Sequence, residues 1–113
     1  MVFPLSIQIT SAHTCENILG QWNGHWDDLQ KIHPASIQFN SIQDEQFKGE
    51  YSLDSGITNP LNGTCTLENS YTEFLVFERV PPYYNPCYGQ LITEVLTIWC
   101  IDPAQSGSFT RAH

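Results

Sequence analysis

The residues best suited to covalent or metal chemistry are the cysteines and histidines. None of the cysteines belongs to a C-x-x-C pair or has a histidine at zinc-finger spacing, so we expect disulfides and no metal site. Four cysteines allow three pairings, and the sequence does not choose among them. The histidines show no mutual spacing that indicates a metal site, and no cofactor is expected. The cysteines are Cys15, Cys65, Cys87 and Cys100, and the histidines His13, His25, His33 and His113.

Motifs for catalysis do not stand out. The sequence shows no Ser-His-Asp order, no phosphate-cradling glycine loop and no paired-carboxylate motif, so no catalytic residue is predicted. An enzyme is therefore the secondary hypothesis.

The formal net charge is −8, from 12 acidic and 4 basic residues. This charge repels phosphate backbones and anionic membrane surfaces, so we expect neither nucleic acid nor membrane as a partner.

The length and composition predict one folded domain. The chain has 113 residues, of which 41% are hydrophobic and 14% charged. We assign residues 1–17 to an N-terminal extension, within which 1–12 resemble an incomplete signal peptide, and 18–113 to the domain. The even cysteine count and the sequon Asn62-Gly63-Thr64 favour a secreted glycoprotein.

From Ile18 onward the sequence consists of short β-favouring runs separated by turn residues. No segment sustains the 3.6-residue apolar period of an amphipathic helix. The loop Pro81-Pro82-Tyr83-Tyr84-Asn85-Pro86 differs from the other connections, because its prolines favour a rigid, aromatic-bearing loop. Eight strands are predicted, at residues 19–24, 36–42, 47–53, 63–68, 73–80, 87–93, 94–102 and 107–112.

Sequential hairpins without intervening helices predict the architecture. Their exposed sheet edges must be protected, and eight strands suffice to close an antiparallel up-and-down β-barrel around a small cavity. We therefore expect an all-β chain that forms such a barrel, with a β-sandwich as the alternative.

Motifs in the first half of the chain resemble those of the avidins. Gly20-Gln21-Trp22 opens the first strand, as Gly-x-Trp does in avidins and lipocalins. Phe47-Lys48-Gly49-Glu50-Tyr51 resembles the Phe-Thr-Gly-Thr-Tyr of the third avidin strand. Pro60-Leu61-Asn62-Gly63-Thr64 resembles Pro-Leu-x-Gly-Thr in the same order.

The second half extends the resemblance to Arg111. Gly89-Gln90 falls where avidins have Gly-Gln, and Phe109-Thr110-Arg111 echoes the final strand. Glu94-Val95-Leu96-Thr97-Ile98-Trp99 resembles the seventh-strand pattern Glu-Val-Leu-x-Thr-x-Trp with one residue missing.

The avidin resemblance implies a small-molecule ligand, with biotin or a biotin-like compound the first to test. It matches Tyr51 to the tyrosine that donates to the ureido oxygen of biotin and Trp99 to a tryptophan that packs on the ligand. Trp22 is expected to seal the closed end of the barrel. Both faces of the strand that contains Trp99 are apolar, which predicts that a partner covers its outer face. Avidins pair through outer barrel faces that include this strand, so the resemblance implies a homo-oligomer through Leu96 and Ile98, with a covering loop as the alternative.

Other matched positions depart from the avidin pattern. Asn23 lies one residue after Trp22 where the avidin ligand-binding asparagine lies two after, so it faces the opposite side unless a bulge intervenes. Asp28 lies in the region of the first loop serine, and Leu53 replaces a hydroxyl-bearing residue. Glu78 matches a binding tryptophan, and a solvent-facing carboxylate is favoured over an inward one. These changes argue against tight biotin binding.

Three functions follow from these residues. The first is a secreted avidin-like binder with candidate ligand contacts Tyr51, Trp99, Asn23, Asp28 and Glu78. The second is a protein-binding or inhibitory module that uses residues 81–86. The third is a small cyclase- or isomerase-type enzyme that uses an inward Glu78 as a general base.

Overall fold

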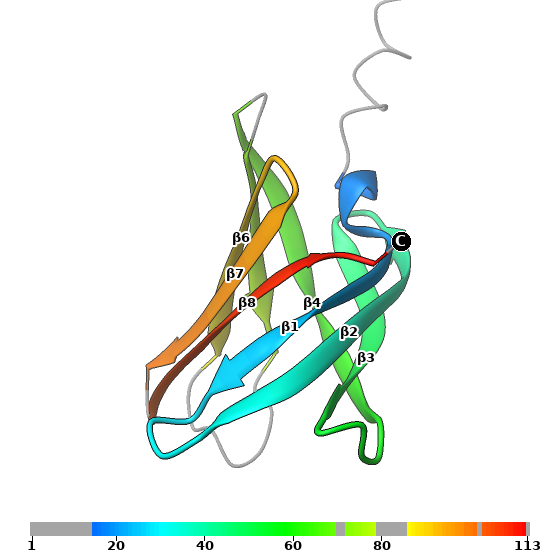
Figure 1. Cartoon of the computed structure of the whole chain (residues 1–113). Coiled ribbons are helices and arrows are strands. Elements are labelled where there is room, and N and C mark those ends of the chain that lie inside the picture. The colour runs from blue at the N-terminus through cyan, green and yellow to red at the C-terminus, as the bar shows by residue number, and fades with distance from the viewer. Residues whose placement is uncertain (1–14, 70–71, 79–85, 102, 113) are drawn as a thin grey trace, which may run out of the picture.

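The polypeptide forms a closed antiparallel barrel of eight strands (Figure 1). The computed structural model describes residues 15–69, 72–78, 86–101 and 103–112. Each strand pairs with the next along the chain, and β1 also pairs with β8. This confirms the predicted all-β, up-and-down barrel. The elements are the 3₁₀ helix η1 (Glu16–Ile18), β1 (Gly20–Asp27), β2 (Ile32–Gln43), β3 (Gln46–Leu53), β4 (Asn59–Asn69), β5 (Thr72–Phe77), β6 (Cys87–Ile92), β7 (Val95–Ile101) and β8 (Ala104–Arg111).

Alternation along each strand divides the side chains into an inner row and an outer row, because successive side chains of a strand point to opposite faces. On β1 the fully buried Trp22 belongs to the inner row, and its exposed neighbours Gln21 and Asn23 belong to the outer row. The inner rows bury large apolar side chains, which include Trp22, Phe39, Phe47, Leu75, Leu91, Leu96 and Phe109.

The two ends of the barrel differ. The base carries η1, the turn at Asp44 and Glu45, and the turn at Thr93 (Figure 1). Asp44 and Glu45 have φ angles of 52° and 69°, and consecutive positive φ values are typical of two-residue hairpin turns. The opposite end, which we call the mouth, is where β1, β3, β5 and β7 end (Figure 1).

Trp22 closes the base, as the sequence predicts. Its ring is fully buried, and its Nε1 donates a hydrogen bond to the Ile18 carbonyl at 2.9 Å. The Arg111 guanidinium lies 4.3 Å from the centroid of the Trp22 ring and donates to the carbonyls of Leu19 and Asn17. A cation over an aromatic face adds to the energy of simple burial. These contacts fix η1 across the base, where the Cys15–Cys65 disulfide also joins it to β4.

Phenylalanines fill the barrel directly above the base. The ring centroids of Phe39 and Phe47 lie 5.2 Å apart, and those of Phe47 and Phe77 lie 5.3 Å apart, both in edge-to-face geometry. Such pairs contribute about 0.5–1.5 kcal/mol beyond their area burial. These aromatic contacts pack the core in the base half of the barrel.

The direction of the β7 side chains corrects two predictions. Leu96 and Ile98 lie on the inner row, 0% and 5% exposed, so they cannot form the predicted interface between subunits. Trp99 lies on the outer row instead of lining the interior. The residue missing after Leu96 explains Ile98 and Trp99, because a shift of one residue turns every following side chain of a strand to the other face. Leu96 precedes the missing residue, and its predicted face was wrong because it was assigned opposite to an inward Trp99.

Candidate ligand-binding cavity

A cavity of about 170 Å³ occupies the mouth half of the barrel. All eight strands contribute to its wall. No lining side chain is charged, and most are apolar. The lining residues are Trp26, Ala35, Ser36, Ile37, Tyr51, Ser52, Leu53, Leu61, Phe77, Cys87, Ile98, Cys100 and Phe109.

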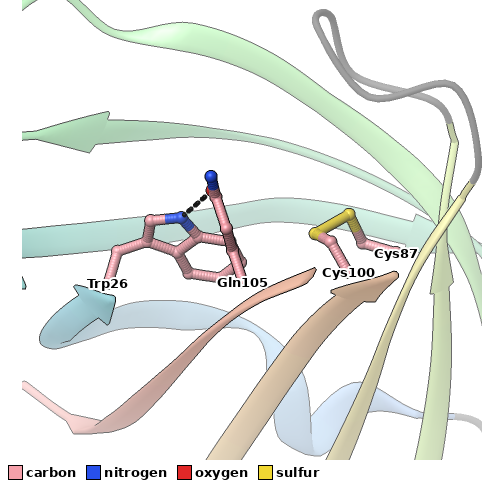
Figure 2. Close-up of a disulfide and its surroundings, with 4 residues drawn as sticks. All are labelled: Trp26, Cys87, Cys100 and Gln105. Carbon is pink, nitrogen blue, oxygen red and sulfur yellow. Dashed lines mark hydrogen bonds between the residues drawn. A yellow bond between two sulfur atoms is a disulfide. The ribbon is translucent and has the colours of Figure 1, made fainter. Parts of the chain in front are cut away.

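Trp26 forms the β1 part of the wall, four residues beyond Trp22 on the same inner row. Its Nε1 donates to the Gln105 Oε1 at 3.0 Å, which orients the indole (Figure 2). Gly107 is opposite Trp26 on β8. A Cβ at Gly107 would lie 2.6 Å from the Trp26 Cε3, closer than carbon atoms approach, so glycine is required for the indole to lie against β8.

A disulfide forms the opposite part of the wall. Cys87 and Cys100 lie on the inner rows of β6 and β7, with Cα atoms 4.4 Å apart and an S–S bond between them (Figure 2). Both side chains are buried, and both line the cavity. The disulfide therefore adds a polarizable, apolar surface and fixes the spacing of β6 and β7 at the mouth.

Tyr51 supplies a polar group to this apolar wall. It lies on the inner row of β3, opposite Ile37, and is half-buried. Burial raises the pKa of its phenol above the ordinary value of 10.0, so the hydroxyl stays protonated near neutral pH. Within the described part of the chain it makes no hydrogen bond, which leaves it able to donate to or accept from a ligand.

Two other predicted site residues lie outside the cavity. Asn23 is exposed on the outer row of β1, as its spacing from Trp22 predicts, and accepts a hydrogen bond from the Gln21 Nε2 at 3.1 Å. Glu78 is exposed just after β5, and its backbone N–H donates to the Asn62 carbonyl at 2.8 Å. Glu78 is thus not the inward general base that the enzyme hypothesis requires.

Trp99 joins an aromatic row on the outside of the barrel. Its ring centroid lies 6.2 Å from that of Tyr88, which lies 6.2 Å from that of Phe74. We call these residues the outer aromatic row. Their position on the outer rows of β5, β6 and β7 excludes Trp99 from the cavity wall.

Asp28 lies at the mouth in the connection between β1 and β2. Its Oδ1 accepts from the backbone N–H groups of Gln30 and Lys31 at 2.9 and 2.7 Å, and its Oδ2 lies 2.8 Å from the His33 Nε2. The hydrogen bond with His33, followed by those two backbone bonds, lowers the pKa of Asp28 to about 2. Asp28 therefore orders the connection and is not part of the cavity lining.

No family model, curated protein or solved structure matches this chain in sequence or in fold. The resemblance to the avidins therefore rests on the short motifs. In the described residues, no group of three or more metal-binding side chains is present, and no helix is long and apolar enough to cross a membrane.

Sequence reasoning missed several residues of the mouth. Trp26 was signalled by its even spacing from the buried Trp22, because residues i and i+4 of a strand share a face. Cys87 and Cys100 were recognised as disulfide candidates, but their place in the cavity wall depends on the register of β6 and β7. Gln105 carried no sequence signal. Residues 81–85 of the proline loop lie outside the described residues.

Proposed function

We propose that this protein binds a small, largely apolar molecule in the mouth cavity. The observation that carries the proposal is a cavity of about 170 Å³ with an uncharged, mostly apolar wall inside an otherwise well-packed barrel. Protein interiors seldom leave voids much larger than a water molecule. Concave, mainly apolar sites with a few polar groups are typical of small-molecule binding.

The wall favours a ligand with an apolar body and one hydrogen-bonding group. Trp26 and Phe77 present aromatic surface to the cavity, and Tyr51 presents a hydroxyl. Because no charged side chain lines the cavity, an ionised group of the ligand would lose its hydration without gaining a partner there. We therefore place any charged group of the ligand at the mouth.

Biotin is the first named compound to test, on the strength of the avidin resemblance. Tyr51 is the one matched ligand-binding side chain that lines the cavity. Asn23, Trp99 and Glu78 face away from it, and Leu53 offers no hydroxyl. We expect biotin to bind far more weakly than an apolar compound of similar size.

A secreted protein is favoured by the two disulfides, since disulfides persist mainly in oxidising compartments. The sequon Asn62 lies in β4, at a half-buried position of its outer row.

We also retain a homo-oligomer as a proposal, now placed on the outer aromatic row instead of on Leu96 and Ile98. Ile92 and Val95, near the base end of the same face, are 47% and 43% exposed. Measuring the molecular mass of wild type and of Trp99→Glu in solution tests this proposal. We expect wild type to have the mass of an oligomer and Trp99→Glu to have a smaller mass, because the introduced charge would disrupt the interface.

Titration with biotin and with the neutral dye N-phenyl-1-naphthylamine tests ligand binding, with dye fluorescence and melting temperature as the readouts. A ligand that binds only the folded state raises its stability. Ala35→Trp places a large ring in the cavity and is expected to abolish dye binding, whereas the outer-row variant Trp99→Phe is expected to retain it. Equal dye binding by folded Ala35→Trp and wild type would overturn the proposal.

A further inference from the structure

His33 occupies the rim of the cavity at the end of an inner row. It precedes the cavity-lining Ala35 and Ile37 by two and four residues on β2, and it is opposite Trp26 of β1. Its side chain is 17% exposed. The ring is therefore close to both the solvent and the cavity wall.

The imidazole of His33 joins two connections that are far apart in the sequence. Its Nε2 lies 2.8 Å from the Asp28 Oδ2, in the connection between β1 and β2. Its Nδ1 lies 2.7 Å from the Asp54 Oδ2, in the connection between β3 and β4. One ring thus spans the two connections that flank the β2 side of the mouth (Figure 1).

The geometry requires a particular charge state. A carboxylate can only accept hydrogen bonds, and a neutral imidazole has one N–H donor, whereas an imidazolium has two. Both short contacts can be hydrogen bonds only when both ring nitrogens carry protons. Deprotonation of His33 would leave a nitrogen lone pair facing a carboxylate oxygen.

Both aspartates are also held by hydrogen bonds of the surrounding backbone. The Asp28 Oδ1 accepts hydrogen bonds from the backbone N–H groups of Gln30 and Lys31, and the Asp28 N–H donates to the Lys31 carbonyl at 3.1 Å. The Asp54 N–H donates to the Pro34 carbonyl at 2.7 Å.

Asp54 also begins a turn next to the cavity. Asp54 and Ser55 have φ angles of 55° and 56°, in the left-handed region that few side chains favour. Leu53, which immediately precedes Asp54, lines the cavity. The ion pair with His33 therefore restrains backbone that is continuous with the cavity wall.

We propose that His33 is a pH-sensitive latch that closes the mouth of the cavity when it is protonated and loosens it when it is deprotonated. The effect on ligand release rests on the proposed function, whereas the latch itself can be observed without a ligand.

The pH range follows from the ionisable groups around the ring. Hydrogen bonding to Asp28, then to Asp54, raises the pKa of His33 above its ordinary 6.5. Because this pKa is raised, the two ion pairs of His33 are fully formed below pH 6.5 and are lost as the pH rises through the folded-state pKa. Asp28, with its pKa lowered to about 2, keeps its charge until strong acid. From β1, the residue that packs beside His33 is the uncharged Trp26.

Three variants separate the latch from a simple packing role. His33→Arg keeps a permanent cation with several N–H donors, so it should hold both carboxylates at every pH. Asp54→Asn lets a neutral imidazole keep both contacts, because the amide N–H₂ can donate to the Nδ1. His25→Ala, an exposed outer-row histidine of β1, is the matched control.

The experiment combines a ligand-free NMR titration of the His33 ring with dissociation rates of N-phenyl-1-naphthylamine from pH 5 to 9. We expect His33 to titrate above 6.5 and dye release to become several-fold faster across that transition in wild type and His25→Ala. In His33→Arg and Asp54→Asn the rate should change little with pH. His33 titration at or below 6.5, or the same pH profile in all four proteins, would overturn the latch. Failure of the dye to bind at any pH would refute the proposed ligand site. The latch would still be tested without a ligand, by the titration of the His33 ring and by the hydrogen-exchange protection of the backbone amides of residues 29–31 and 55–58.

Discussion

Trp26 and Gln105 connect the first and last strands of the barrel through a hydrogen bond from the indole Nε1 to the side-chain Oε1 at 3.0 Å. The pair lies where β1 and β8 meet, so it contributes both to the closure of the barrel and to the shape of the cavity (Figure 2). Replacement of Gln105 by alanine should leave the half-buried indole N–H without this acceptor.

We expect Gln105→Ala to lower the free energy of unfolding by about 1 kcal/mol, the typical net value of one hydrogen bond. Urea denaturation followed by tryptophan fluorescence measures this change. Ser108→Ala, on the outer row of the same strand, is the control and should be nearly neutral. Equal stability of the two variants would show that the indole finds another acceptor.

Arg111 is expected to stabilise the base of the barrel. Its guanidinium covers the Trp22 ring and donates to two carbonyls at the base. Arg111→Ala should therefore destabilise the barrel by about 2–3 kcal/mol, because a cation–π contact and two charged hydrogen bonds are lost together. Lys48→Ala, at an exposed outer position of β3, is the control in the same denaturation experiment. A loss no greater than that of the control would contradict this role.

The two disulfides should contribute unequally. Cys15–Cys65 spans 50 residues and Cys87–Cys100 spans 13. The chain-entropy account predicts contributions of about 4 and about 3 kcal/mol, since the longer loop loses more entropy in the unfolded chain. Double alanine variants measured by chemical denaturation test the order. A lower stability of the variant that lacks Cys87–Cys100 than of the variant that lacks Cys15–Cys65 would contradict the entropic account. Loss of Cys87–Cys100 should also weaken dye binding, because this disulfide lines the cavity.

Glu73 makes stability depend on pH. It is buried on the inner row of β5 near the base, and its Oε2 has no hydrogen-bond partner among the described residues. Burial raises the pKa of Glu73 above 4.5, against the opposing effects of the Asn17 hydrogen bond and the Arg111 charge. A carboxyl whose pKa is raised in the folded state contributes its full stabilisation below pH 4.5. It loses that contribution as the pH rises through the folded-state pKa.

Glu73→Gln should consequently melt at a higher temperature than wild type at pH 7, and the difference should shrink as the pH falls through the folded-state pKa of Glu73 and be smallest below pH 4.5. Thermal unfolding at several pH values tests this, with the exposed Glu68→Gln as the control. A Glu73→Gln variant that is less stable than wild type at pH 7 would show that the ionised carboxylate is needed.

The sequence predicted the strand order and closure well, because hairpin connections between eight β-favouring runs leave few other ways to protect the sheet edges. Alternation along β1 from the inward Trp22 turns Asn23 outward, so Asn23 is not the ligand contact that the avidin resemblance implies. The inward Tyr51 was expected from that resemblance alone. The prediction failed on β7, where a single residue missing after Leu96 turned Ile98 inward and Trp99 outward, and where Leu96 had been assigned to the face opposite an inward Trp99.

The remaining parts of the site depend on contacts between distant segments. His33 meets Asp54 only because β2 and β3 pair in one register, and Trp26 meets Gln105 only because the barrel closes between β1 and β8. Neither pairing has a local sequence signal. The cysteine pairing was undetermined for the same reason.

Nuclear Overhauser effects between bound N-phenyl-1-naphthylamine and the methyl groups of the protein test the ligand site most directly. We predict contacts with Ala35, Leu53 and Ile98, whose methyl groups line the cavity. Contacts confined to Ile92, Val95 or Ile101, which are exposed on the outer face, would place the dye outside the barrel and contradict the proposed site.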